Sequence, residues 1–217
     1  RNVLRSPDVI GAIEVEKIEV LQAIADKVNA DAVTNGDPNP NYAAYLMEGN
    51  DPGGIDVGFL VKTSRINVTD VIQYGKTTTY IDPNNGLPDL LNDRPPLVLI
   101  ASFNQPGCST SYPFTVIVNH LRSLNGIDDP TDGNRVRTKR RAQAEFLANL
   151  IQTMQTSDPG ARILSVGDYN AFQFSDGYVD IIGTVKGNPT AASQVTLSSV
   201  DLVNPDLVDL VDSHTPD

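Results

Sequence analysis

LSVGDYNAFQFSDGYVDIIG, residues 164–183, has a pattern typical of the end of a buried strand that continues directly into a polar turn. The apolar run ends at Gly167, and Asp168 and Asn170 follow it. Side chains of an extended chain alternate between faces, so these two should project to the same side if the extended geometry persists. A carboxylate and an amide aimed together from the edge of a sheet suit a hard cation or a phosphate.

The composition is that of an acidic globular protein of 217 residues. Apolar residues make up 40% and charged residues 20%, which argues against wholesale disorder and allows a sizeable core. The net charge of −11 opposes non-specific binding of DNA by the whole surface, although a bound divalent cation can reverse the field at a site. No apolar stretch approaches a membrane span and no signal peptide is recognisable, so we expect no transmembrane segment.

A single cysteine, Cys108, cannot form an internal disulfide, and there is no cysteine cluster to support a zinc site. The chain opens on RNVLRSPDVI, which is typical of the interior of a domain. A cleaved or truncated precursor would explain this opening. The absence of a signal peptide therefore says little about the compartment.

Apolar patterning predicts a chain in which strands dominate and helices are interspersed. The expected strands cover residues 7–15, 41–49, 55–62, 65–74, 97–103, 113–121 and 161–167. Helices are expected at 16–30, with Ile18, Leu21, Ile24 and Val28 on the apolar face, and at 134–155. A turn-rich loop is expected at 79–96. This order favours an α/β or α+β layered sandwich formed by one domain over residues 1–217.

Polar groups stand at the ends of four of these strands. Glu14 closes one strand, Asp56 opens another, His120 closes a third, and Asp168 with Asn170 follows a fourth. Groups on strand ends and adjoining loops are what a site mounted on a rigid sheet requires. Singly, each has a purely structural interpretation: a solvated glutamate, a satisfied histidine, or an Asx turn.

Taken together, the motifs resemble the endonuclease/exonuclease/phosphatase family of deoxyribonuclease-I-like hydrolases. The resemblance is carried by DVIGAIEVE, IVNHLRS and GDYNAF, and by EGNDPGGIDVGFLVK, RPPLV and RRAQAEFLANLI between them. It covers most of residues 7–187, and GDYNAF with VNHLRS is its most specific part. It implies a four-layer α/β/β/α sandwich of two packed sheets flanked by helices, with the site at one sheet edge.

The resemblance also implies roles for the strand-end residues. Glu14 would hold a divalent metal, Mg²⁺ or Mn²⁺, and no cofactor beyond the metal is implied. Asp168 would orient or deprotonate the attacking water, or help to bind the metal. Asn170 would hydrogen-bond the phosphate, and His120 would stabilise its developing charge. These roles agree with the chemistry, because phosphodiester hydrolysis places negative charge on oxygens where cations and N–H donors are needed.

Two further residues are assigned more loosely. Asp56 would orient His120, and a turn residue before a strand is the alternative interpretation. Arg94 in NDRPPLV matches a family arginine that approaches the phosphate, and its alternative is a surface arginine in a proline-bounded loop. Some relatives carry an arginine where this chain has Gly53, so one cationic contact would be missing.

Two other features have alternative interpretations. The basic run RVRTKRR, residues 135–141, is expected to form a solvated helix face, and a phosphate-backbone track is the alternative. Tyr169 and Phe172 flank the aspartate–asparagine pair. Packing is their expected role, with stacking on a nucleobase as the alternative.

The family pattern is incomplete at both ends. The family begins with a strand that bears a metal-site asparagine, but few residues precede the DVIG strand here, and Asn2 stands in the wrong context. The family ends with a histidine that acts as acid or base. His214, in VDSHTPD, does not match that motif, and we assign it no role. We therefore expect a fragment without the first and last core strands, which leaves sheet edges exposed.

The leading hypothesis is a metal-dependent phosphodiesterase, a secreted or cell-surface bacterial nuclease whose substrate is nucleic acid. A second hypothesis replaces the substrate with a phospholipid headgroup or a phosphoinositide, which a hydrophobic lip beside the site would favour. A third is a catalytically degenerate binding module. The missing terminal histidine motif supports the third, and retention of Glu14, His120, Asp168 and Asn170 opposes it.

Overall fold

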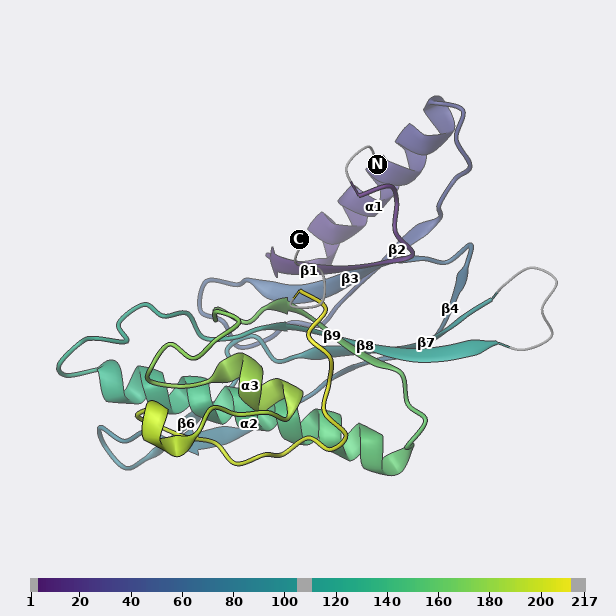
Figure 1. The fold of residues 1–217 in the computed structure, drawn as a ribbon. Helices are drawn as coiled ribbons and strands as arrows, with labels where there is room; N and C mark the ends of the chain where they lie inside the picture. The colour runs from purple at the N-terminus through teal and green to yellow at the C-terminus, as the bar shows by residue number, and fades with distance from the viewer. Residues whose placement is uncertain (1–3, 105–110, 212–217) are drawn as a thin grey trace, which may run out of the picture. The chain divides into compact units, whose positions relative to one another are not determined.

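The computed structural model describes residues 4–104 and 111–211, and the chain divides into two compact units (Figure 1). Unit 1 comprises Arg1–Lys76, Asp93–His120 and Ala161–Gly167, and unit 2 comprises Thr77–Asn92, Leu121–Gly160 and Asp168–Asp217. The positions discussed above for Asn2, Cys108 and His214 lie outside the described residues. The assignment of one domain to the whole chain stays a prediction.

Unit 1 is built from strands in two sheets and one covering helix. The first sheet has the order β1-β3-β2 and the second β4-β7-β8-β9. The bounds are β1 (Val9–Val15), α1 (Ile18–Thr34), β2 (Tyr42–Leu46), β3 (Asp56–Lys62), β4 (Ile66–Gln73), β7 (Leu97–Phe103), β8 (Tyr112–His120) and β9 (Ile163–Asp168), whose last residue belongs to unit 2. The predicted strands are thereby confirmed, with ends shifted by a few residues. The expectation that the strand before Gly167 is buried is wrong, because no residue of β9 is buried.

The two sheets of unit 1 share an aliphatic core. Phe59 and Val61 of β3 pack in one cluster with Leu97 and Leu99 of β7 and Val118 of β8, all of them fully buried. In β3 and β7 the residues that belong to this cluster are two positions apart, as expected when one face of each strand turns toward it. Burial of each such side chain contributes about 1.5–3 kcal/mol to folding. This core fixes the strand ends that carry the candidate residues.

Helix α1 covers the other face of the first sheet. Leu21 and Ala25 are buried against Val15 and Leu60. The predicted apolar face is only partly correct, because Ile24 is 47% exposed. The helix turns its Leu21–Ala25 stripe to the sheet, and small alanines on that stripe let the two elements approach closely.

Unit 2 holds the remaining helices and a small hairpin. Its elements are β5 (Thr79–Ile81), β6 (Pro88–Leu90), α2 (Gly133–Ser157), α3 (Ile181–Lys186) and the 3₁₀ helix η1 (Ala192–Gln194). The hairpin corrects the prediction of an irregular loop at 79–96, since Tyr80 pairs with Asp89. These strands are too short and too rich in turn residues to show an alternating pattern.

The prediction of a solvated basic face at 135–141 is wrong for two residues. Lys139 is 5% exposed and Arg140 is completely buried. Seven consecutive helical residues span almost two turns and therefore reach every side of the helix, so some of the basic residues must face inward. A phosphate-backbone track needs exposed cations and cannot include Arg140.

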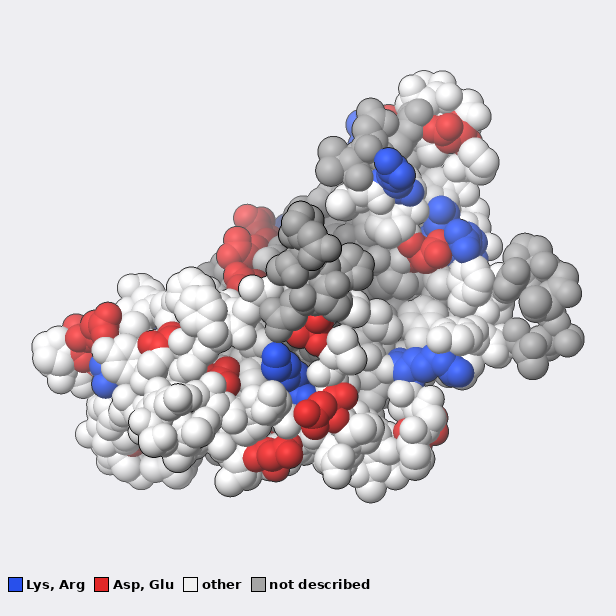
Figure 2. Space-filling model, viewed as in Figure 1, with Lys and Arg blue, Asp and Glu red and all other residues white. Residues whose placement is uncertain are grey.

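Charge on the surface is mixed. Figure 2 shows Lys and Arg side chains in small separate groups among acidic and uncharged residues on the face viewed. No helix within residues 4–104 and 111–211 is long and apolar enough to cross a membrane.

Candidate active site

The GDYN motif forms a tight turn at the end of β9. Asp168 is the last residue of the strand, and its Oδ1 accepts the N–H of Asn170 at 2.7 Å. Asn170 has φ +48°, so the expectation that the extended geometry persists is wrong. Asparagine tolerates this left-handed conformation, and an aspartate two residues earlier stabilises it through an Asx turn. The turn, rather than strand alternation, sets the positions of the carboxylate and the amide.

Gly167 permits the close approach of two strands just before this turn. Its φ is +130°, and a Cβ at this position would lie 2.0 Å from the carbonyl oxygen of Asn119. A side chain would therefore collide with the backbone of β8. The glycine of the motif is required by packing, independently of any chemical role.

The turn is also tied to the residue that follows His120. Leu121 donates its N–H to the carbonyl of Asp168 at 2.9 Å, and its own carbonyl accepts Nδ2 of Asn170 at 3.0 Å. Thr115 likewise donates its N–H to the carbonyl of Arg162. In both bonds the donor and acceptor residues are the same number of positions apart in the sequence, so β8 and β9 run parallel. A primary amide carries two N–H donors, so the bond to Leu121 does not exhaust the donors of Asn170.

A buried arginine of α2 holds the same turn from within unit 2. Nη1 of Arg140 donates to the carbonyls of Arg122 at 2.6 Å and Asn170 at 2.9 Å, and Nη2 bonds Oδ2 of Asp176 at 3.1 Å. Burial lowers the pKa of Arg140, and the charge of Asp176 opposes that shift. The guanidinium thus connects both ends of the 170–176 loop.

Gln143, one turn later on α2, also bonds backbone groups of loop residues through its side chain. Its Oε1 accepts the N–H of Arg122 at 2.7 Å, and its Nε2 donates to the carbonyl of Leu91 at 2.8 Å. Neither Arg140 nor Gln143 is among the site residues predicted from the sequence. A signal was present, because Arg140 and Gln143 are three positions apart in RRAQAEFL and lie on the same side of the helix as Leu147.

In unit 1, Arg94 contacts the backbone of His120. Nε of Arg94 donates to the His120 carbonyl at 3.3 Å, and its Nη1 pairs with Oδ2 of Asp51 at 2.6 Å. Both side chains of this ion pair are about nine-tenths buried, so Arg94 is not the surface arginine of the alternative interpretation. His120 is itself 5% exposed at the end of β8. The approach of Arg94 to a phosphate stays a prediction.

Asp56, the first residue of β3, is a buried carboxyl group beside another acid. It is 3% exposed, and its Oδ1 accepts the N–H of Gly49 at 2.8 Å. Burial raises the pKa of Asp56 to about 6; the Gly49 bond opposes the shift, and the neighbouring Glu48 adds to it. The orientation of His120 by Asp56 stays a prediction.

This raised pKa predicts that Asp56 makes the protein less stable as the pH rises from about 4 to about 6. In that range the unfolded chain releases the proton while the folded protein retains it, so unfolding becomes easier. Above about pH 6 the penalty is constant, at about 3 kcal/mol. Asp56→Asn should be more stable than the wild type at pH 7.5 in urea unfolding, and less dependent on pH between 4 and 6. The exposed Asp70→Asn control should show neither change, and equal behaviour of the two variants would contradict the assignment.

Glu14 lies at a β-bulge near the end of β1. The pairing with β3 shifts register between Ala12 and Val15, and Glu14 has φ +56°. Bulges redirect side chains at sheet edges, and here the carboxylate of Glu14 is exposed. Val15, the next residue, pairs with Asp56.

The candidate carboxylates have the chemistry that the implied metal requires. The portion of the chain that the structure describes has no group of three or more His, Cys, Asp or Glu side chains that could hold an ion. Mg²⁺ does not require such a group, since it is usually bound by one or two carboxylates, waters and substrate phosphates. Exposed Glu14 and half-buried Asp168 therefore suit Mg²⁺ or Mn²⁺ chemically.

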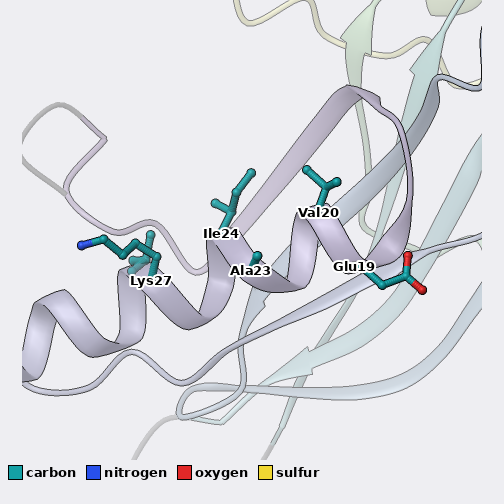
Figure 3. A pocket seen from close by; sticks show the side chains of 6 residues that line it. Glu19, Val20, Ala23, Ile24 and Lys27 are labelled. Carbon is teal, nitrogen blue, oxygen red and sulfur yellow. The ribbon is translucent and has the colours of Figure 1, made fainter.

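A shallow pocket of about 570 Å³ lies along α1 and does not involve the candidate residues. Side chains from successive turns of this one helix line it (Figure 3). They are Glu19, Val20, Ala23, Ile24, Lys27 and Val28. The lining is mostly aliphatic and offers little chemistry for a phosphate.

Comparison with solved structures identifies the fold. The catalytic domain of human Nocturnin, with a bound sulfate anion, matches with a TM-score of 0.51 and 14% identity, over 79% of this chain and 54% of that chain. ANGEL2, a 2′,3′-cyclic phosphatase in complex with adenosine-2′,3′-vanadate, matches with a TM-score of 0.50 and 17% identity, over 84% and 44%. An endonuclease/exonuclease/phosphatase family protein from Bacteroides thetaiotaomicron has a TM-score of 0.47 and 10% identity, over 84% and 54%.

The chain has the deoxyribonuclease-I-like fold of endonuclease/exonuclease/phosphatase proteins, which confirms the predicted fold class and the resemblance. It spans about half the length of the solved structures that it matches. No protein-family model and no curated protein sequence matches it. At these identities the likeness concerns the fold, so activity is a matter for proposal.

Proposed function

We propose that the protein is a divalent-metal-dependent phosphodiester hydrolase that acts on nucleic acid. The observation that carries this proposal is the Asp168–Asn170 turn, which is anchored by Leu121 and Arg140 at the end of β9. Sulfate in Nocturnin and an adenosine vanadate in ANGEL2 support it, because both ligands carry an oxyanion comparable to a phosphate.

Each candidate residue has a proposed role. Asp168 orients the attacking water and accepts its proton, and Asn170 donates an N–H to a phosphate oxygen. His120 stabilises the negative charge that develops on the phosphate, while Asp56 keeps its ring oriented. Arg94 adds a cationic contact.

Glu14, with Asp168, would hold the metal. When bound, Mg²⁺ or Mn²⁺ supplies charge neutralisation at the phosphate and lowers the pKa of a coordinated water. An exposed carboxylate on a bulge suits an ion that keeps most of its waters. An extracellular or cell-surface location is also proposed, on the strength of the sequence resemblance to bacterial members.

The test is cleavage of nucleic acid by the full chain in Mg²⁺ or Mn²⁺, with and without a chelator. We expect chelator-sensitive nicking of a supercoiled plasmid and cutting of a single-stranded oligonucleotide. His120→Asn, which fills similar space without a positive charge, should lower the rate roughly 10²–10³-fold. Cleavage that persists in chelator would contradict metal dependence. A folded chain that cleaves no phosphodiester would favour the binding-module alternative.

A further inference from the structure

Two phenylalanines in the loop after Asn170 form an exposed aromatic pair within unit 2. The ring centroids of Phe172 and Phe174 are 5.4 Å apart, and the ring planes differ by 7°. Their side chains are 51% and 71% exposed. The sequence-based expectation that Phe172 serves packing is therefore wrong, because its ring contacts another exposed ring and remains open to solvent.

The arrangement differs from an isolated apolar residue at a surface. Single exposed apolar side chains are common and need no explanation. Here two rings lie parallel, with Gln173 between them in the sequence, so they present a flat apolar face to solvent. Flat π faces are suited to planar ligands, which stack on them.

The loop that carries the pair is fixed at both ends. Arg140 bonds the carbonyl of Asn170 at one end and the carboxylate of Asp176 at the other. Asp176 also accepts the N–H groups of Tyr178 and Val179, each within 2.8 Å. A short loop clamped in this way holds its side chains near one position.

The pair is also close to Asn170 along the chain. Phe172 is two positions after Asn170, so their Cα atoms are at most about 7 Å apart. Within one nucleotide, the base lies at a comparable distance from the phosphate that would contact Asn170. The proposed phosphate donor and a stacking surface are therefore spaced as adjoining parts of one nucleotide require.

We propose that Phe172 and Phe174 form a stacking platform for a nucleobase next to the cleaved phosphate. The inference rests on the proposed function and narrows its substrate to single-stranded nucleic acid, in which bases are available for stacking. Bases in an intact duplex are paired and stacked with one another, so a platform of this kind selects against them.

A lipid surface is a poorer fit to the same pair. Membrane binding grows with the buried apolar area and with attraction between cationic side chains and anionic lipids. Two rings offer little area, and the chain carries a net charge of −11. A single base requires only one ring face and no charge complementarity.

The first measurement is binding of a single-stranded oligothymidylate that contains one 2-aminopurine, in the absence of metal. Stacking on the platform should quench the 2-aminopurine fluorescence. Phe172→Ala and Phe174→Ala should weaken binding roughly 10- to 100-fold. Phe174→Trp, which keeps an aromatic face, should bind as well as the wild type. Tyr112→Ala removes another exposed aromatic ring, on β8, and should leave binding unchanged. Because all these positions are exposed, urea unfolding midpoints should be close to that of the wild type.

Hydrolysis in Mg²⁺ provides the second measurement. The alanine variants should raise the KM for the oligonucleotide while leaving unchanged the rate on a small phosphodiester without a base. An unchanged KM and unchanged quenching would overturn the platform even if hydrolysis is normal. Quenching that depends on the two rings, in a chain that hydrolyses nothing, would retain the platform and refute the proposed hydrolase. If the wild type binds phosphatidylcholine–phosphatidylglycerol vesicles and the alanine variants do not, while the variants still bind the oligonucleotide, the aromatic pair would instead be assigned to a membrane.

Discussion

Asp168→Asn is expected to lower the kcat of phosphodiester hydrolysis roughly 10²–10⁴-fold without disturbing the fold. Asparagine is nearly isosteric, and its Oδ1 can still accept the N–H of Asn170 that closes the turn. The variant loses the negative charge that accepts a proton from water. The KM for an oligonucleotide, measured at saturating Mg²⁺, should change less than kcat, because phosphate and base contacts also come from residues other than Asp168. Steady-state kinetics in Mg²⁺ measures kcat and KM, and circular dichroism checks the fold.

A matched control for this substitution exists elsewhere in unit 2. Asp158, just after α2, accepts the N–H of Gly160 at 2.9 Å and closes a turn of the same kind, but it is exposed and precedes β9, whereas Asp168 ends that strand. Asp158→Asn should leave kcat unchanged. If Asp168→Asn retained the activity of this control, Asp168 would have a structural role only, and the proposed mechanism would lose its base.

Arg140→Met is expected to lower the free energy of unfolding by about 3–5 kcal/mol. Methionine fills similar space, but it leaves the carboxylate of Asp176 and the carbonyls of Arg122 and Asn170 without the donor that satisfies them in a buried environment. Urea unfolding monitored by circular dichroism gives the free energies.

The adjacent residue supplies the comparison. Arg141 pairs with Glu145 at 3.7 Å, and both side chains are about one-third exposed. Exposed pairs of this kind contribute about 0–1 kcal/mol, so Arg141→Met should change stability by no more than that. Equal losses in the two variants would show that the Arg140 contacts are not a principal source of stability. The loss of stability in Arg140→Lys should fall between those of Arg140→Met and Arg141→Met, since lysine keeps the charge but lacks the planar fork with which the guanidinium reaches all three acceptors.

The strands could be predicted because their residues alternate or form apolar runs of characteristic length. The predicted positions of Glu14, His120 and Asp168 at strand ends follow from the same patterns, and the structure confirms those positions. Their chemical roles stay predictions. The left-handed conformation of Asn170 could not be predicted from strand alternation, because a local Asx turn overrides the extended geometry.

Features that depend on distant partners were not predictable. Arg140 belongs to a run of basic residues that is typical of an exposed face, and its acceptors lie 18 to 36 positions away in sequence. Its spacing to Gln143 and Leu147 places it on the packed side of the helix, but no local pattern identifies the acceptors that it meets there. The exposure of Phe172 was also not predictable from the sequence, because phenylalanine is more often buried than exposed.

The guanidinium of Arg140 has a consequence for the order of folding. Helix α2 can form its own backbone bonds early, because helical contacts are local in sequence. Its buried arginine cannot give up water until the 170–176 loop arrives with the Asn170 carbonyl and the Asp176 carboxylate. We therefore expect hydrogen exchange during refolding to protect the helix first and the loop last. The segment that carries the phosphate donor and the aromatic pair would then be the last part of unit 2 to become native.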